Sequence, residues 1–189
     1  MKVRVGVILE SAMATTTFIP VSEYLATSYR PDRDYVDGEV RARNLGERPH
    51  AALQGILFAI FHANRQKWKI VALPKQRVQV SRTHYRVPDL CVVSKNDPVH
   101  VVITTAPMIC IEILSSGDSI SSIQERADEY TAIGVGHIWV ADPISRRVWT
   151  VSSDGLYPVR EDLLVVPGTP IEISLPKVFA ELDELLSNQ

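Results

Sequence analysis

The segments Arg86-Val-Pro-Asp-Leu-Cys-Val-Val93 and Met108-Ile-Cys-Ile-Glu-Ile-Leu114 decide the fold. Each is a nearly continuous apolar run, which is typical of a strand buried on both faces of a sheet. Each also carries one acid, Asp89 at the mouth of the first run and Glu112 within the second. A buried carboxylate is costly unless it is paired, hydrogen-bonded or bound to a metal. The two segments therefore predict a sheet that holds two compensated acids.

Helical and extended patterns surround these two runs in a regular order. Apolar residues recur at helical spacing in residues 49–66 and again in residues 120–133. The strand-like runs cover residues 70–80, 85–93, 108–114 and 137–141. The order helix, three strands, helix, strand at the centre of the chain predicts a single domain of the α/β (α+β) class.

Turn signals place a hairpin on each side of this core. Asp37-Gly38 and Asp154-Gly155 lie between apolar flanks, and Asp-Gly is a strong signal for a two-residue hairpin turn. We also expect a short helix at residues 20–25 and a closing helix at residues 176–186. The core is therefore extended by an N-terminal hairpin and by a C-terminal hairpin and helix.

The length and composition are those of one soluble globular domain. The chain has 189 residues, of which 46% are hydrophobic and 22% charged. No apolar run approaches the ~20 residues that span a bilayer, and two cysteines do not make a disulfide scaffold. We expect a cytoplasmic protein without a membrane partner. Residues 13–189 would form the domain, and residues 1–12 an N-terminal extension before an alternative start at Met13.

Opposite charges gather in the two halves of the chain. Lys and Arg outnumber Asp and Glu by 15 to 9 in residues 1–100 and are outnumbered by 13 to 5 in residues 101–189. Residues 41–86 hold ten basic residues and one acid, Glu47. This excess is either the footprint of a polyanion or a set of side chains that scatter over several faces after folding.

Asp89 and Glu112 together indicate a metal site. Two acids that enter one sheet from adjacent strands can hold a hard cation such as Mg²⁺, which prefers oxygen ligands. Each acid also has a simpler explanation, because Glu112 could form a salt bridge with a buried arginine and Asp89 could be a turn or capping residue. The combination of both acids favours the metal site.

Several short motifs along the chain resemble those of one nuclease family. They are Tyr35-Val-Asp-Gly-Glu39, His50 on a helix, Pro88-Asp89, Ile111-Glu-Ile-Leu-Ser115, Tyr130-x-x-x-Gly-Val135 and Trp139-Val-x-Asp-Pro143. In this order and spacing they resemble the Uma-type restriction endonucleases of the PD-(D/E)xK nuclease superfamily, over residues 13–185. The resemblance implies a restriction-endonuclease-like fold, in which a mixed sheet is flanked by helices. It also implies Mg²⁺ or Mn²⁺ as cofactor, DNA as partner and substrate, and a homodimer.

The resemblance also assigns roles to single residues. It makes Asp89 and Glu112 the metal ligands and the main-chain oxygen of Ile113 a third ligand. It makes Glu39 the upstream acid that completes such sites. Together with one basic residue, Arg126, these residues form the site that the resemblance implies.

The sequence departs from the family pattern at that basic residue. Leu114 stands where the superfamily has its lysine, and Arg126 stands where the Uma-type pattern has one. Arginine keeps its proton, so Arg126 can stabilise charge on a phosphate but cannot act as a base. We therefore expect a divalent-metal-dependent DNA endonuclease with modified machinery. The alternative is a non-catalytic dimeric nucleic-acid-binding protein on a decayed nuclease scaffold.

Two geometric expectations follow from this reading. The first assumes that the strands carrying Asp89 and Glu112 are antiparallel neighbours with these acids opposite each other. Cys91 then lies opposite Cys110, and we expect both cysteines to be buried, unbonded thiols. Arg126 flanks the buried stripe of its helix, so its side chain can extend toward the two acids. If it takes the place of the family's lysine, its guanidinium should lie within about 4 Å of Asp89 or Glu112 and be their only nearby cation. The alternative is an exposed helix arginine.

Other candidate residues have two readings each. His50 and Gln54 lie one helical turn apart and face either the site or solvent, and Gln76 either binds a metal water or lies on the surface. Ser115-Ser116-Gly117 resembles a nucleophile loop, but no histidine and acid accompany it in a recognisable arrangement.

Overall fold

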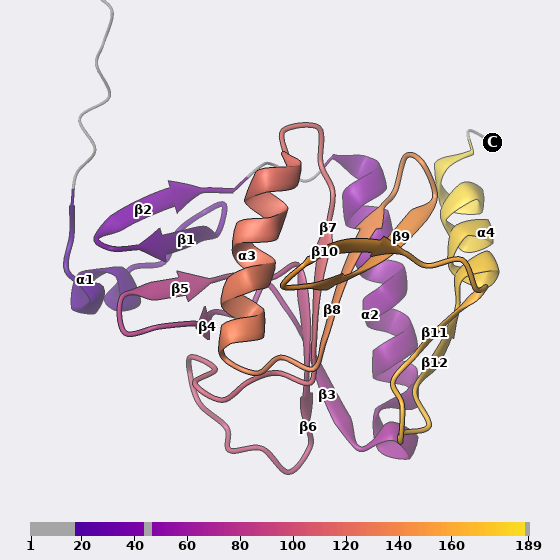
Figure 1. Ribbon diagram of the computed structural model, residues 1–189, viewed down its shortest axis with the longest axis horizontal. Coiled ribbons are helices and arrows are strands. Elements are labelled where there is room, and N and C mark those ends of the chain that lie inside the picture. The colour runs from indigo at the N-terminus through magenta and orange to yellow at the C-terminus, as the bar shows by residue number, and fades with distance from the viewer. Residues whose placement is uncertain (1–17, 44–46, 188–189) are drawn as a thin grey trace, which may run out of the picture.

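Residues 18–43 and 47–187 are described by the computed structural model of the protein (Figure 1). The helices are α1 (Val21–Ala26), α2 (Arg48–Trp68), α3 (Ile120–Ala132) and α4 (Leu175–Leu186). The strands are β1 (Arg33–Val36), β2 (Glu39–Ala42), β3 (Ile70–Pro74), β4 (Val78–Gln79), β5 (His84–Arg86), β6 (Leu90–Ser94), β7 (Ile109–Ile113), β8 (His137–Asp142), β9 (Arg147–Ser152), β10 (Gly155–Pro158), β11 (Leu163–Val165) and β12 (Glu172–Ser174). The extension predicted at residues 1–12 and the start predicted at Met13 lie outside the described residues.

Most of these strands form one mixed sheet, the main sheet, in the order β10-β9-β8-β7-β6-β3. Neighbouring strands are antiparallel except β7 and β8, which are parallel and are joined through α3. A parallel pair needs such a crossover because the chain must return to the end of the sheet where the first strand began before the second strand can run in the same direction. The elements α2, β3, β6, β7, α3 and β8 follow the predicted order, and the predicted α/β architecture of a mixed sheet flanked by helices is confirmed.

The helices cover opposite faces of the main sheet (Figure 1). On one face α2 and α4 pack against the alternate residues Ile109, Ile111 and Ile113 of β7. On the other face α3 packs its stripe of Ile123, Ala127 and Tyr130 against Cys91 and Cys110. The sheet is therefore buried on both faces, as the apolar runs predicted.

A second sheet, the small sheet, lies beside the main sheet in the order β2-β1-β5-β4 (Figure 1). Its β1–β2 hairpin turns at Asp37-Gly38, and both residues have positive φ, 47° and 94°. This is the conformation for which Asp-Gly is favoured in two-residue turns. The predicted N-terminal hairpin is present, and so is the β9–β10 hairpin predicted at Asp154-Gly155.

Two predicted strands are each broken in two. The run at residues 70–80 ends as β3 at Pro74, because Lys75 adopts a left-handed conformation with a φ of 52° that no strand continues through. The run at residues 85–93 is interrupted between β5 and β6, where Pro88 has no N–H to donate. Consequently β4 and β5 join the small sheet while β3 and β6 stay in the main sheet. The β11–β12 pair was not predicted.

The pairing of β6 with β7 has the predicted register. Leu90 pairs with Ile111 and Cys91 with Cys110, so one step further along Asp89 and Glu112 become neighbours. Both cysteines are buried and unbonded, and burial raises the pKa of Cys91 to about 12. The thiols therefore keep their protons and act as small apolar groups.

The basic residues of the 41–86 segment do not form one continuous surface. Arg86 is buried, Arg43 is nearly so, and Arg77 lies over the ring of Tyr24 at 4.5 Å. Arg65 is exposed at the far end of α2. The expectation of scattered side chains is the one that the structure supports.

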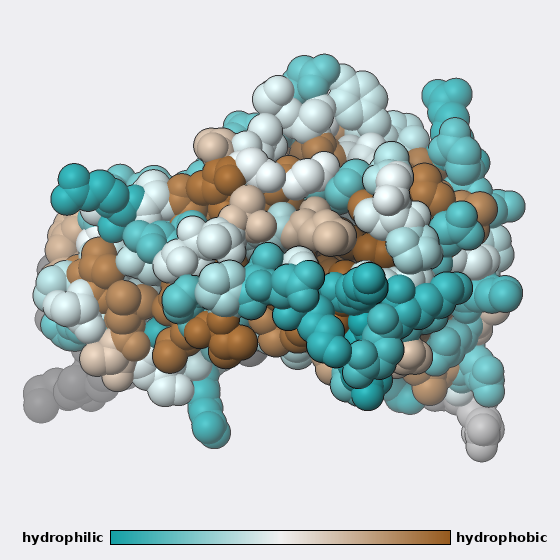
Figure 2. Space-filling view, turned by 90° about the horizontal axis from the view of Figure 1, so that it is seen from below, coloured by the Kyte–Doolittle hydropathy of each residue, from teal (hydrophilic) through white to brown (hydrophobic). Residues whose placement is uncertain are grey.

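The surface carries separate apolar patches. Figure 2 shows the lower face of the molecule, where hydrophobic patches are interrupted by hydrophilic side chains. Val99 and Val101, in the loop between β6 and β7, are almost fully exposed. No helix in the described part of the chain has the length and apolarity needed to cross a bilayer.

Candidate functional site

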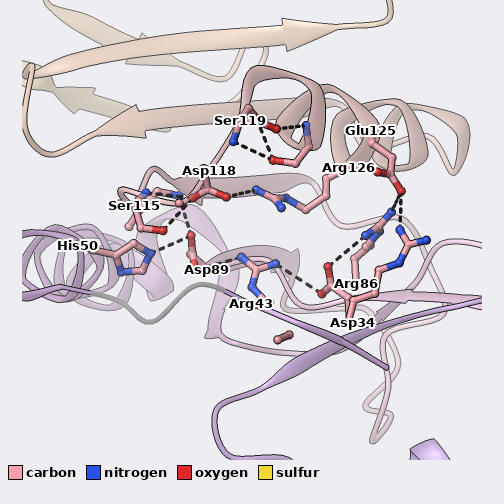
Figure 3. A pocket seen from close by; sticks show the side chains of 15 residues that line it. Asp34, Arg43, His50, Arg86, Asp89, Ser115, Asp118, Ser119, Glu125 and Arg126 are labelled. Atoms are coloured by element: carbon pink, nitrogen blue, oxygen red, sulfur yellow. Dashed lines mark hydrogen bonds and ion pairs between the residues drawn. The ribbon is translucent and has the colours of Figure 1, made fainter. Parts of the chain in front are cut away.

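Two buried acids lie side by side where β6 begins and β7 ends. Asp89 directly precedes β6 and Glu112 is the second-last residue of β7; their exposed fractions are 1% and 2%. Asp89 lines a polar pocket of about 270 Å³ that also takes side chains from β1, α2 and α3. Figure 3 shows these side chains converging on the pocket from elements far apart in the sequence.

Asp89 is held as a carboxylate by donors on both of its oxygens. Its Oδ2 accepts the main-chain N–H of Ile113 at 2.7 Å and lies 3.2 Å from His50 Nε2. Its Oδ1 lies 3.4 Å from Arg43 Nη2 and in contact with Lys75 Nζ. Burial alone would raise the pKa of Asp89, but the hydrogen bond with His50 and the charges of Arg43 and Lys75 outweigh it and lower that pKa.

Glu112 also has donors on both of its oxygens. Its Oε1 accepts a hydrogen bond of 2.7 Å from the Tyr130 hydroxyl, and burial raises the pKa of Tyr130 well above its usual range. The tyrosine therefore stays protonated and donates. Glu112 Oε2 accepts from Arg43 Nη2 at 2.8 Å and lies 3.4 Å from Arg126 Nε.

Arg43 contacts both acids with one guanidinium group. Its side chain is 11% exposed, and its Nη1 lies 3.5 Å from Asp34 Oδ1. Burial works against the charge, but Glu112, Asp34 and Asp89 together raise the pKa of Arg43 well above its usual value. Figure 3 shows the resulting line of contacts from His50 through Asp89, Arg43 and Asp34 to Arg86.

The sequence and the fold of this chain agree with one known family. The sequence model of the Uma2 family, described as "Putative restriction endonuclease", matches residues 21–182. The chain belongs to this Uma2 family.

A solved structure supports the fold of this Uma2 protein. The crystal structure of a protein from Anabaena variabilis, described as "a putative nuclease belonging to DUF820", superposes with a TM-score of 0.74 at 21% sequence identity. The match covers 87% of this chain and 99% of that one. No curated protein matches the chain.

The predicted contact of Arg126 with the acids is present in the Uma2 protein, at 3.4 Å from Glu112. Its Nη2 donates to Asp118 Oδ1 at 3.1 Å, so the guanidinium lies between the site and the loop before α3. The expectation that Arg126 is the only cation near the acids is wrong, because Arg43 and Lys75 contact them as well. The buried arginine considered as a partner for Glu112 is therefore Arg43.

Glu39 does not reach the acid pair. Its Oε2 accepts from Arg41 Nε at 3.0 Å, and its side chain is 38% exposed. Pairing of β1 with β2 puts Glu39 on the same side as Asp34 but two residues nearer the turn, about 7 Å further along the strands. Asp34, which sequence analysis did not single out, is the upstream acid that borders the site.

Of the remaining candidates, two belong to the site and two do not. His50 faces Asp89, and Gln54 donates from Nε2 to the main-chain oxygen of Asp89 at 2.6 Å, so both belong to the site. Gln76 donates instead to the main-chain oxygen of Val101. The Ser115 hydroxyl donates to Asp118, which is a loop contact rather than the activation of a nucleophile.

The carboxylate pair is the candidate centre for a cation. Over residues 18–43 and 47–187, no group of three or more His, Cys, Asp or Glu residues has a geometry that could hold a metal ion. Side-chain ligands would therefore be limited to Asp89 and Glu112. Main-chain oxygens and water would have to complete the coordination of any bound ion.

A second ion network fixes α3 against the small sheet. Arg86 Nη1 lies 3.2 Å from Asp34 and its Nη2 lies 2.7 Å from Glu125 on α3. Next to it, His84 lies between Asp37 and Glu129, at 3.0 and 2.6 Å. Burial works against the charge on His84, but hydrogen bonds with Asp37 and Glu129 outweigh it and raise the pKa of the imidazole.

We expect His84→Gln to lower the free energy of unfolding mainly at acidic pH. A group whose pKa is higher in the folded protein stabilises the fold below its unfolded pKa of about 6.5 and loses that contribution as pH rises through the folded pKa. Urea unfolding of both proteins between about pH 5 and about pH 9 should show a difference that shrinks as the pH rises. An equal difference at every pH would contradict the assignment.

Proposed function

We propose that this protein is a divalent-metal-dependent endonuclease that hydrolyses phosphodiester bonds in DNA. The observation that carries the proposal is the pair of buried carboxylates, Asp89 and Glu112, on adjacent strands, with Asp89 in the lining of a polar pocket. Membership of the Uma2 family supports a nucleic acid as the substrate. A homodimer remains our expectation from the family resemblance.

The residues present suit a hard cation. Asp89 and Glu112 supply carboxylate oxygens from adjacent strands, and the main-chain oxygen of Ile113 would be the third ligand. Mg²⁺ and Mn²⁺ accept such a set with water in the remaining positions. When bound, the cation would make water a stronger nucleophile and offset negative charge on the phosphate.

The protein's own side chains would hold this geometry and bind the phosphate. Tyr130 fixes Glu112 and His50 fixes Asp89, so the two carboxylates keep their orientation. Arg126 lines the pocket with its guanidinium 3.4 Å from Glu112, where it can stabilise negative charge on a phosphodiester. Because arginine stays protonated, the chain's Arg126 serves as a fixed charge and not as the base.

One observation favours a second candidate function, a non-catalytic nucleic-acid-binding protein. Every carboxylate oxygen of Asp89 and Glu112 already has a donor from the protein within 3.5 Å. A site compensated in this way is stable without metal. The same scaffold could then hold nucleic acid as a dimer and leave it uncleaved.

Plasmid nicking with and without metal separates the two functions. We expect the protein to nick supercoiled DNA with Mn²⁺ and not with EDTA. Asp89→Asn should reduce the rate by more than about 100-fold, beyond the 10–100-fold typical for loss of an outer partner of a metal ligand. Asp183→Asn is the matched control, because Asp183 is an exposed residue of α4 paired with Arg146. Wild-type protein that binds plasmid but never nicks it would leave only the binding function.

Substitutions of Arg126 test its place in the site. Arg126→Lys keeps a positive charge and restores the family's residue, so nicking should be equal to wild type or faster. Arg126→Ala should abolish nicking. Since Arg43 and Lys75 still compensate the acids, the alanine variant should lose less unfolding free energy than Arg43→Ala. Urea unfolding and nicking rates measure both effects, and wild-type nicking by the alanine variant would remove Arg126 from the site.

A further inference from the structure

Arg43 stands at the position that a cation shared by Asp89 and Glu112 would need. Among the described residues, Arg43 Nη2 is the only cationic nitrogen in contact with both acids, at 3.4 Å from Asp89 and 2.8 Å from Glu112. The other cations each contact one of them, Lys75 the aspartate and Arg126 the glutamate. The guanidinium of Arg43 therefore bridges the pair as a bound metal ion would.

A metal ion shared by the two acids competes with this guanidinium for the same oxygens. A divalent cation lies about 2 Å from its oxygen ligands, and Arg43 Nη2 already lies 2.8 Å from Glu112 Oε2 and 3.4 Å from Asp89 Oδ1. The ion and the guanidinium repel as like charges at this separation, so binding of the ion favours a conformation in which Arg43 has moved away.

Arg43 is incompletely hydrogen-bonded, and so is Arg126, whose Nε also has no hydrogen-bond acceptor among the described residues. Arg43 Nη1 is buried and has no hydrogen-bond acceptor among the described residues, since Asp34 Oδ1 at 3.5 Å is too poorly placed. A buried donor without an acceptor carries a desolvation cost that release into solvent removes. In contrast, Arg86 next to it contacts three carboxylates, those of Asp34, Glu125 and Glu129.

We infer that Arg43 is the built-in cation of the metal-free site and that a divalent ion binds by displacing it. This inference rests on the proposed function, because it assumes that Asp89 and Glu112 bind metal. Displacement makes metal binding weaker than the two carboxylates alone would give. It also explains how the acids stay buried in the absence of metal.

Calorimetric titration with Mn²⁺ as the probe tests the competition. Arg43→Gln removes the charge and keeps a polar side chain, so Mn²⁺ should bind the variant at least tenfold more tightly than wild type. Arg41→Gln is the matched control: Arg41 lies two residues earlier, pairs with Glu39 and Glu125, and should leave the affinity within about twofold. Equal or weaker binding by Arg43→Gln would overturn the inference.

Chemical modification of the wild-type protein tests the same inference without relying on a variant that folds correctly. Phenylglyoxal labels accessible arginines, and mass spectrometry locates the label. Arg43 should be protected without metal and labelled with saturating Mn²⁺, while Arg86 stays protected in both states. Protection of Arg43 that does not change with bound Mn²⁺ would overturn the inference and leave the proposed function standing. Failure of wild type and Arg43→Gln alike to bind Mn²⁺ would instead overturn the metal site itself.

Discussion

The burial of Asp89 and Glu112 side by side is the constraint on which the rest of this structure depends. Two ionised carboxylates removed from water cost several kcal/mol each unless the protein supplies charges and hydrogen bonds. Here Arg43, Lys75 and Arg126 supply the charges. The breaks that end β3 and begin β6 bring Lys75 and Asp89 to the same place, so the irregular backbone at the site has an electrostatic reason.

Compensation of the acids also joins the parts of the fold. Arg43 follows the β1–β2 hairpin of the small sheet and contacts acids of the main sheet, and Arg86 on β5 reaches α3. These contacts tie the small sheet to the main sheet and to the helix that carries Arg126. The site is thus built by the packing of the two sheets, and each charge in it has a partner on another element.

The sequence predicted the parts of this arrangement that follow from local pattern. Apolar periodicity predicted α2 and α3, and two acids in apolar runs identified Asp89 and Glu112. The β6–β7 register followed from the assumption that these two acids lie opposite each other. Arg43, Asp34 and Lys75 carry no local signal, because their role depends on how the small sheet meets the main sheet. Glu39 fitted a motif, but it lies two residues nearer the hairpin turn than Asp34 and pairs with Arg41 instead of reaching the site. The ends of β3 and β5 depended on the backbone conformations at Lys75 and Pro88, which apolar runs alone do not reveal.

The most direct test of the metal centre is a crystal structure of the protein soaked in Mn²⁺, with anomalous data at the manganese edge. The carboxylates should share one anomalous peak at about 2 Å from an oxygen of Asp89 and of Glu112, with Arg43 turned away from both. Saturating Mn²⁺ that leaves no peak between these acids, with the Arg43 guanidinium still spanning them, would contradict the assignment of this pair as the metal site.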